Sequence, residues 1–72
     1  MIRRRGTKLV REGDYAADVP VYFIEDDTGW SPYLSPEDAY KLDDVRQALR
    51  AGDVVAAAKL ARVFRLAPVA AT

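Results

Sequence analysis

Residues 15–25 read Tyr-Ala-Ala-Asp-Val-Pro-Val-Tyr-Phe-Ile-Glu, and the alternation of their side chains determines the architecture predicted for the rest of the chain. The odd-numbered positions place five apolar side chains on one face of an extended segment: Tyr15, Ala17, Val19, Val21 and Phe23. The even-numbered positions are mixed in polarity. One apolar face and one mixed face are typical of a strand in an antiparallel sheet that is covered on a single side. Pro20 has no N–H to donate, so we expect it at an edge or a bulge.

The segment before this strand predicts its partner. Residues 7–12 have the length of a short strand, with Leu9-Val10 as its apolar centre. Gly13-Asp14 then forms a two-residue loop. A two-residue hairpin loop that opens with glycine favours a type II′ turn, because glycine adopts the required positive φ without steric cost. We therefore predict a hairpin, preceded by a flexible basic arm at residues 1–6.

The segment after the strand predicts a turn and a short third strand. Residues 26–29 read Asp-Asp-Thr-Gly, which is turn chemistry, and residues 30–34 are short and aromatic. Asp27-Thr28-Gly29 also matches the short signature of aspartic proteases, in which two aspartates activate a water. That signature normally follows an apolar strand end, whereas Glu25 and Asp26 precede it here. A turn is the favoured interpretation.

The second half of the chain predicts two helices and a last strand. Ser35 is a good N-cap, and the Pro-Glu-Asp that follows suits a first helical turn, so a helix should run from residue 36 to about residue 51. Gly52 suits the position after its end, and Asp53 can cap a second helix that runs to about residue 62. Residues 63–67 would form the last strand.

These elements predict an α+β fold: a small antiparallel sheet in the order β-β-β-α-α-β, with two helices packed on one face. The single domain spans residues 7–69, and residues 70–72 form a tail. A domain of this size buries only about 60% of the surface of its unfolded chain. We therefore expect association with a partner or with a second copy.

The composition removes most conventional catalytic chemistry. The 72 residues include no Cys and no His, so thiol nucleophiles, imidazole bases, disulfides and Cys/His metal sites are absent. The acidic runs lack the spacing of a cation-binding loop. We predict no enzymatic activity, no metal and no cofactor. The apolar runs are shorter than the ~18 residues of a membrane-spanning helix, and residues 1–5 do not resemble a signal peptide, so we expect a cytoplasmic protein without membrane contact.

Charge is sorted along the chain, although the formal net charge is zero. Residues 1–13 carry five basic side chains and one acidic, residues 14–44 carry nine acidic and one basic, and residues 45–72 carry five basic and one acidic. Sorted charge serves either pairing within the chain, which is the simpler interpretation, or a partner of opposite sign. Aromatic side chains in the acidic segment add rigid contact area. We predict a partner-binding surface made of Glu25, Asp26, Asp27, Trp30, Tyr33 and Tyr40.

The order of these motifs resembles HicB-type antitoxins. The resemblance covers roughly residues 8–51 and is carried by the run from Glu12 to Pro20, then a turn, a short strand and Ser35-Pro36-Glu37-Asp38-Ala39. The chain departs from that family in lacking a Pro-Gly-Cys-like turn after Val19-Pro20 and in adding a second helix. Residues 29–35 and 61–64 also resemble short bacterial proteins encoded near toxin–antitoxin genes. Both resemblances imply a bacterial partner-binding protein without an activity of its own.

Three functions follow from these patterns. The first is an antitoxin-like interaction module whose acidic and aromatic surface binds a basic protein such as a toxin. The second is a homo-oligomeric structural or regulatory unit that pairs through the last strand or the small-residue helix at residues 54–62. The third is nucleic-acid contact through Arg3, Arg4 and Arg5, for which the alternative is a mobile, solvated terminus.

Overall fold

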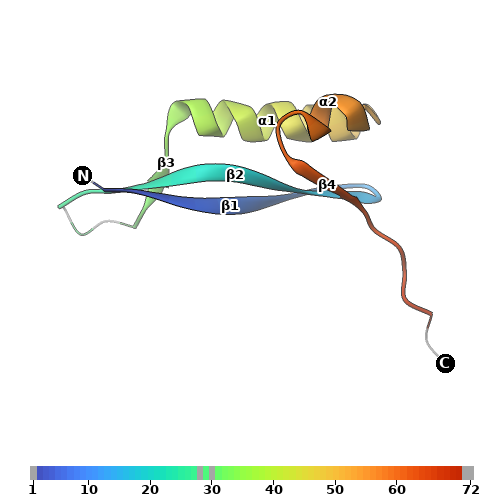
Figure 1. Cartoon of the computed structure of the whole chain (residues 1–72), viewed down its shortest axis with the longest axis horizontal. Coiled ribbons are helices and arrows are strands. Elements are labelled where there is room, and N and C mark those ends of the chain that lie inside the picture. The colour runs from blue at the N-terminus through green and yellow to red at the C-terminus, as the bar shows by residue number, and fades with distance from the viewer. Residues whose placement is uncertain (1, 28, 30, 71–72) are drawn as a thin grey trace.

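The structure is a computed structural model that describes residues 2–27, 29 and 31–70. Its elements follow in the order β1 (Ile2–Glu12), β2 (Tyr15–Glu25), β3 (Tyr33–Leu34), α1 (Pro36–Arg50), α2 (Val54–Ala58) and β4 (Arg62–Arg65). Within the described residues the four strands form one antiparallel sheet, and both helices lie on the same side of it (Figure 1). The predicted α+β class, element order and one-sided helix layer are confirmed.

β1 and β2 form a hairpin along their whole lengths, from the pair Ile2–Glu25 to the pair Glu12–Tyr15. The loop is Gly13-Asp14. Gly13 has a φ of 57°, and no described residue other than glycine has a positive φ. These signs of φ agree with the predicted type II′ turn.

The N-terminal residues belong to the sheet. β1 begins at Ile2, and residues 2–6 pair with residues 21–25 of β2. The prediction of a flexible arm over residues 1–6 is therefore wrong for residues 2–6, whereas Met1 lies outside the described residues. Three consecutive arginines show no alternation of polarity, so they gave no strand signal. Pairing with β2 uses backbone groups, which every non-proline residue has.

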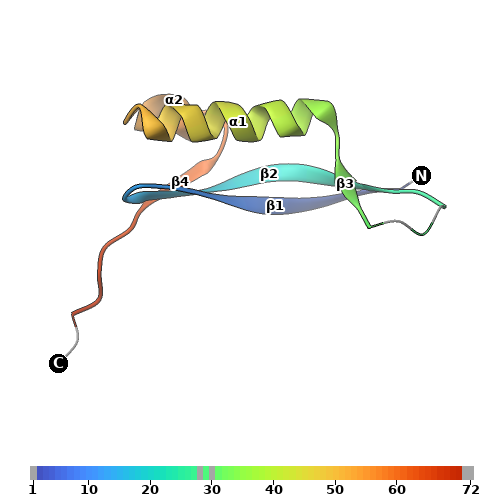
Figure 2. The same cartoon turned by 180° about the vertical axis from the view of Figure 1, so that it is seen from behind.

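β2 is the central strand, and its second edge is shared by two short strands. β4 pairs with residues 15–18, and β3 pairs with Phe23 and Ile24. In Figures 1 and 2, β3 and β4 accordingly lie toward opposite ends of β2. None of the described strands lies beside residues 19–22 of β2 on that edge. We call this stretch the edge gap.

Pro20 lies in the edge gap, as its missing N–H predicts. The N–H of Tyr22 points away from β1, because it donates to Oδ2 of Asp38 at 2.8 Å. Pro20 is two residues earlier and therefore faces the same edge. Nζ of Lys41 donates to the carbonyl oxygen of Pro20 at 2.7 Å. Two side chains of α1 thus take the place of a strand in the gap.

The helices begin at the predicted caps. Oγ of Ser35 accepts the N–H of Asp38 at 3.2 Å, and Oδ1 of Asp53 accepts the N–H of Ala56 at 3.1 Å. α1 ends within one residue of the prediction. α2 is shorter than predicted, because its last turn loosens after Ala58 and β4 already begins at Arg62.

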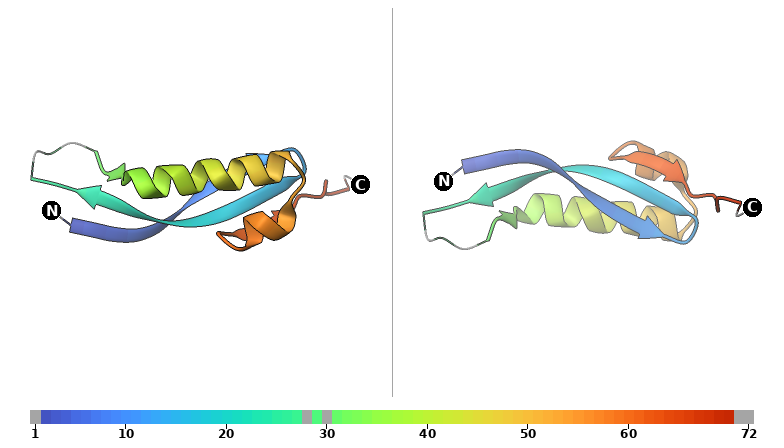
Figure 3. Two further views of the ribbon diagram at one scale, coloured as in Figure 1. Left: turned by 90° about the horizontal axis from the view of Figure 1, so that it is seen from above. Right: turned by 90° about the horizontal axis from the view of Figure 1, so that it is seen from below.

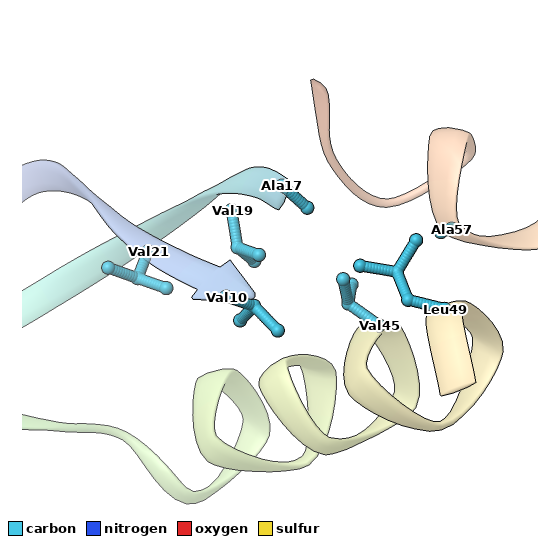
Figure 4. Close-up of a cluster of buried hydrophobic side chains, with 7 residues drawn as sticks. All are labelled: Val10, Ala17, Val19, Val21, Val45, Leu49 and Ala57. Atoms are coloured by element: carbon cyan, nitrogen blue, oxygen red, sulfur yellow. The ribbon is translucent and has the colours of Figure 1, made fainter. Parts of the chain in front are cut away.

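The hydrophobic core lies between the hairpin and the helices (Figure 4). Its fully buried members come from β1, β2, α1 and α2: Val10, Ala17, Val19, Val21, Val45, Leu49 and Ala57. The predicted apolar face of β2 is therefore the buried one. The Cα radius of gyration is 14.6 Å, larger than the ~11 Å of a compact domain of this length. The molecule is a thin slab, and one side of its sheet carries neither of the described helices.

Candidate functional site

The side of the sheet opposite to the helices is not covered by any described helix or strand. The view from below in Figure 3 shows β1 and β2 in front of α1. Side chains alternate between the two faces of a strand, so the residues that do not face the core lie here. We call this surface the open face. Its residues are Arg3, Arg5, Thr7, Leu9, Arg11, Ala16, Asp18, Pro20, Tyr22, Ile24, Tyr33, Arg62 and Phe64.

The open face is basic. It carries four arginines, namely Arg3, Arg5, Arg11 and Arg62, and a single acid, Asp18. Among the described residues, no ion pair within 4.0 Å involves any of these four arginines. Their charge is therefore available to a partner.

Two of these arginines stack on exposed aromatic rings. Cζ of Arg3 lies 4.6 Å from the ring centroid of Tyr22, and Cζ of Arg62 lies 5.0 Å from that of Phe64. Both distances are within the range of a cation–π contact. Tyr22 and Phe64 are each 38% exposed, and Leu9 on β1, on the same face, is 67% exposed. The open face therefore combines cationic groups with accessible apolar and aromatic surface.

Two shallow grooves lie along the edge gap, beside the open face. One, of about 500 Å³, is lined by Arg5, Thr7, Pro20, Tyr22, Asp38 and Lys41, together with the backbone beneath them. The other, of about 420 Å³, is lined by Thr7, Asp18, Pro20, Arg62 and the segment between α2 and β4. Thr7 and Pro20 line both, so the grooves are neighbours. They follow from the edge gap, since no strand fills the space beside Pro20.

The predicted acidic and aromatic surface is not assembled in one place. Tyr33 lies on the open face opposite Ile24, and it is 48% exposed. Tyr40 lies on α1, five residues before the buried Val45, which turns it about 140° around the helix from that core position. It therefore points away from the sheet and is 70% exposed. The two tyrosines belong to opposite layers of the molecule.

The predicted acids gather at the end of β2. Glu25 faces the helix side, where Oε2 lies 3.3 Å from Nε of Arg4, and Asp26 is also half-buried. Asp27 is exposed in the turn. Trp30 lies outside the described residues. Among the predicted partner-binding residues, Asp27 and Tyr33 are thus exposed at this end, whereas Glu25 is already paired within the chain.

The predicted nucleic-acid residues divide between the two faces. Arg3 and Arg5 lie on the open face, and Arg4 lies on the other face, bound to Glu25. Sequence reasoning missed Arg11 and Arg62, which complete the basic set. The alternation within the predicted strand at residues 7–12 could have indicated Arg11, because it alternates with the buried Val10 and lies on the same face as Leu9. No local signal places Arg62 there, because that depends on how β4 pairs with β2.

Part of the sorted charge pairs within the chain. Oε1 of Glu12 lies 2.8 Å from Nη2 of Arg50 and 3.7 Å from Nε of Arg46, which joins β1 to α1. The hydrogen bond that Arg50 donates to Glu12, and then the negative charge of Glu12, raise the pKa of Arg50 above its ordinary value. Nη1 of Arg46 also lies 3.3 Å from Oδ1 of Asp43. The expectation of pairing within the chain is confirmed for these groups.

Within residues 2–27, 29 and 31–70, no group of three or more acidic side chains is arranged to hold a metal ion. Neither described helix is long and apolar enough to cross a membrane. Comparisons with protein-family models, curated proteins and solved structures find no match to this chain. The functional interpretation therefore starts from the open face.

Proposed function

We propose that this chain is a small non-enzymatic binding module that holds a polyanionic partner on its open face. The observation that carries the proposal is the meeting, on one uncovered side of the sheet, of four arginines that form no ion pair with another described residue. Arg3, Arg5 and Arg11 come from β1, and Arg62 comes from β4 near the other end of the sequence.

The charge of this face is favourable for binding, although the whole chain is neutral. Guanidinium groups present several donors in a rigid plane that matches phosphate and carboxylate oxygens. Binding to a polyanion also releases its condensed counterions, which makes the affinity fall with salt. The acids that neutralise the chain overall lie mostly on α1 and in the turn after β2, and only Asp18 among them lies on the open face.

The experiment measures binding of inorganic polyphosphate to the full chain at several salt concentrations. We compare Arg5→Gln with Lys8→Gln, a matched control on the same strand. Lys8 lies two residues from the buried Val10, so its side chain leaves the strand on the helix side of the sheet and not on the open face. We expect Arg5→Gln to weaken binding. The slope of log affinity against log salt concentration should also fall by about one, the value for one lost phosphate contact. Lys8→Gln should leave both nearly unchanged.

Two results would overturn the proposal. One is the absence of polyphosphate binding at low salt. The other is an equal loss of affinity in the Arg5 and Lys8 variants, which would show that binding follows net charge rather than the open face.

A second candidate is supported by the outward side of α1. Glu37, Tyr40 and Asp44 are exposed there, at helical spacing and away from the sheet. This surface fits the antitoxin-like function that the resemblance to HicB-type antitoxins implies, in which a basic protein such as a toxin is the partner. Recovery of a basic protein from native cells, with loss of that protein in Asp44→Asn, would support it. An unchanged recovery with this variant would contradict it.

A further inference from the structure

We infer that the polyanion held on the open face is a single-stranded nucleic acid whose bases stack on Tyr22 and Phe64. This inference rests on the proposed function and adds the chemical class of the ligand. The features that carry it are two exposed aromatic rings, each in contact with an arginine, and the two neighbouring grooves that lie between them.

The rings are accessible to a planar group. Each already carries a guanidinium plane, Arg3 at 4.6 Å from the centroid of Tyr22 and Arg62 at 5.0 Å from that of Phe64. A nucleobase is a larger plane with a π-face, and it can replace the guanidinium on the ring. The displaced arginine keeps its charge for the adjoining phosphate. An acidic peptide would use the arginines but would leave both rings without a stacking partner.

The spacing of the rings suits a strand of several nucleotides. Tyr22 lies six residues along β2 from Ala16, the residue opposite Phe64, which corresponds to about 20 Å along the strand. Two grooves that both contact Thr7 and Pro20 lie between the rings, one lined by Tyr22 and the other by Arg62. Arg5, Asp38 and Lys41 line the groove near Tyr22, where Asp38 and Lys41 are hydrogen-bonded to the backbone of β2. Arg5 is therefore the cationic contact for the phosphates between the stacked bases.

A duplex does not fit this surface in the same way. Its bases are stacked on one another, so their faces cannot reach the rings of Tyr22 and Phe64. A shallow sheet would contact only the phosphates of a duplex. The open face therefore predicts a preference for single strands over a duplex of the same sequence.

The experiment compares ligands that differ in one property at a time. The first probe is a fluorescently labelled single-stranded DNA of about eight nucleotides, a length within the site sizes of known single-strand-binding folds. The other nucleic-acid probes are an abasic strand of the same length and the corresponding duplex. Polyglutamate serves as the acidic-peptide probe. We expect the single strand to bind at least about tenfold more tightly than each of the others at equal salt, since base stacking contributes strongly per base.

The variants separate stacking from folding. Tyr22→Leu and Phe64→Leu should each weaken binding of the single strand by about tenfold and leave binding of the abasic strand unchanged. Tyr22→Phe keeps the ring and should restore the affinity. Tyr40→Leu, which changes an exposed tyrosine on the opposite layer, is the matched control and should bind as the unmodified chain does.

The outcomes distinguish this inference from the function on which it rests. Equal binding of the abasic strand, the duplex or polyglutamate, with no effect of Tyr22→Leu, would overturn the stacking of bases but would leave a polyanion-binding module. Absence of binding to polyphosphate and to every probe would overturn both.

Discussion

Single residues set the boundaries and close contacts of this fold. Gly6 on β1 faces the ring of Phe23, and a Cβ added at Gly6 would lie 2.6 Å from Cε2 of that ring. Pro20 lies where no strand needs its missing N–H. Ser35, which is 8% exposed, caps α1. Gly6 suits its position because it lacks a Cβ, and Pro20 because its N–H is not needed. Ser35 suits its position because its hydroxyl oxygen accepts a hydrogen bond.

Gly6→Ala should destabilise the chain by about 1–3 kcal/mol, because the new methyl group forces the Phe23 ring out of its place. The measurement is urea unfolding followed by circular dichroism. In a Phe23→Leu background the same Gly6→Ala change should cost clearly less, because the atoms in conflict are gone. Equal costs in both backgrounds would show that the glycine is needed for another reason.

Ser35→Ala should destabilise the chain by about 1 kcal/mol, because the N–H of Asp38 loses its hydrogen bond to Oγ. Thermal or urea unfolding measures the effect. Ser31→Ala, in an exposed segment before β3, provides the control and should change stability by much less. A stability unchanged by Ser35→Ala would mean that water replaces the cap without loss.

At the scale of elements, the edge gap is the place where α1 is hydrogen-bonded to the sheet. β3 and β4 are too short to cover β2, and Asp38 and Lys41 of α1 bind its backbone between them. The helix is therefore attached to the sheet by hydrogen bonds as well as by the core residues Val45 and Leu49. The same gap leaves the two grooves beside Pro20.

Asp38→Ala should destabilise the chain by about 1 kcal/mol, because the N–H of Tyr22 loses its acceptor. Amide hydrogen exchange of Tyr22 should accelerate more than that of residues in the β1–β2 ladder. Asp44→Ala, on the same helix but exposed, is the control and should leave the exchange of Tyr22 unchanged. Equal exchange of Tyr22 in the two variants would contradict the role given to Asp38.

Much of the fold could be predicted from local patterns. The alternation in residues 15–25, the Gly13-Asp14 loop and the Ser35 cap each depend on neighbours in sequence, and each is confirmed. The start of β1 and the extent of α2 could not be predicted, because both depend on pairing with β2. The same holds for the candidate site. Arg3, Arg5 and Arg62 share a face only once the register of three strands is known.

At the scale of the whole molecule, opposite charges lie on opposite sides of a thin slab. The open face carries the arginines without ion pairs, and the outward side of α1 carries exposed acids. The outer edge of β1 is also unpaired over its length among the described strands. Such an edge can pair with another copy unless its charges prevent it. Arg3, Arg5 and Arg11 place positive charge along this edge.

Removing that charge should promote self-association. We expect Arg3→Thr/Arg5→Thr to shift the chain toward dimers or larger species in sedimentation experiments, because threonine favours strands and no longer repels a second copy. Lys59→Thr/Arg65→Thr removes two charges away from β1 and should have no such effect. Association of this second variant alone would instead identify β4 as the interface, as the homo-oligomer hypothesis predicts.

The position of β4 also has a kinetic consequence. The β1–β2 hairpin closes through a two-residue loop and can form early, whereas β4 reaches β2 only after the intervening helices have folded back. Arg62 and Phe64 therefore join the sheet late. A ligand that touches both β1 and β4 should slow unfolding while leaving the rate of refolding nearly unchanged, because its complete binding surface exists only after the rate-limiting barrier has been crossed.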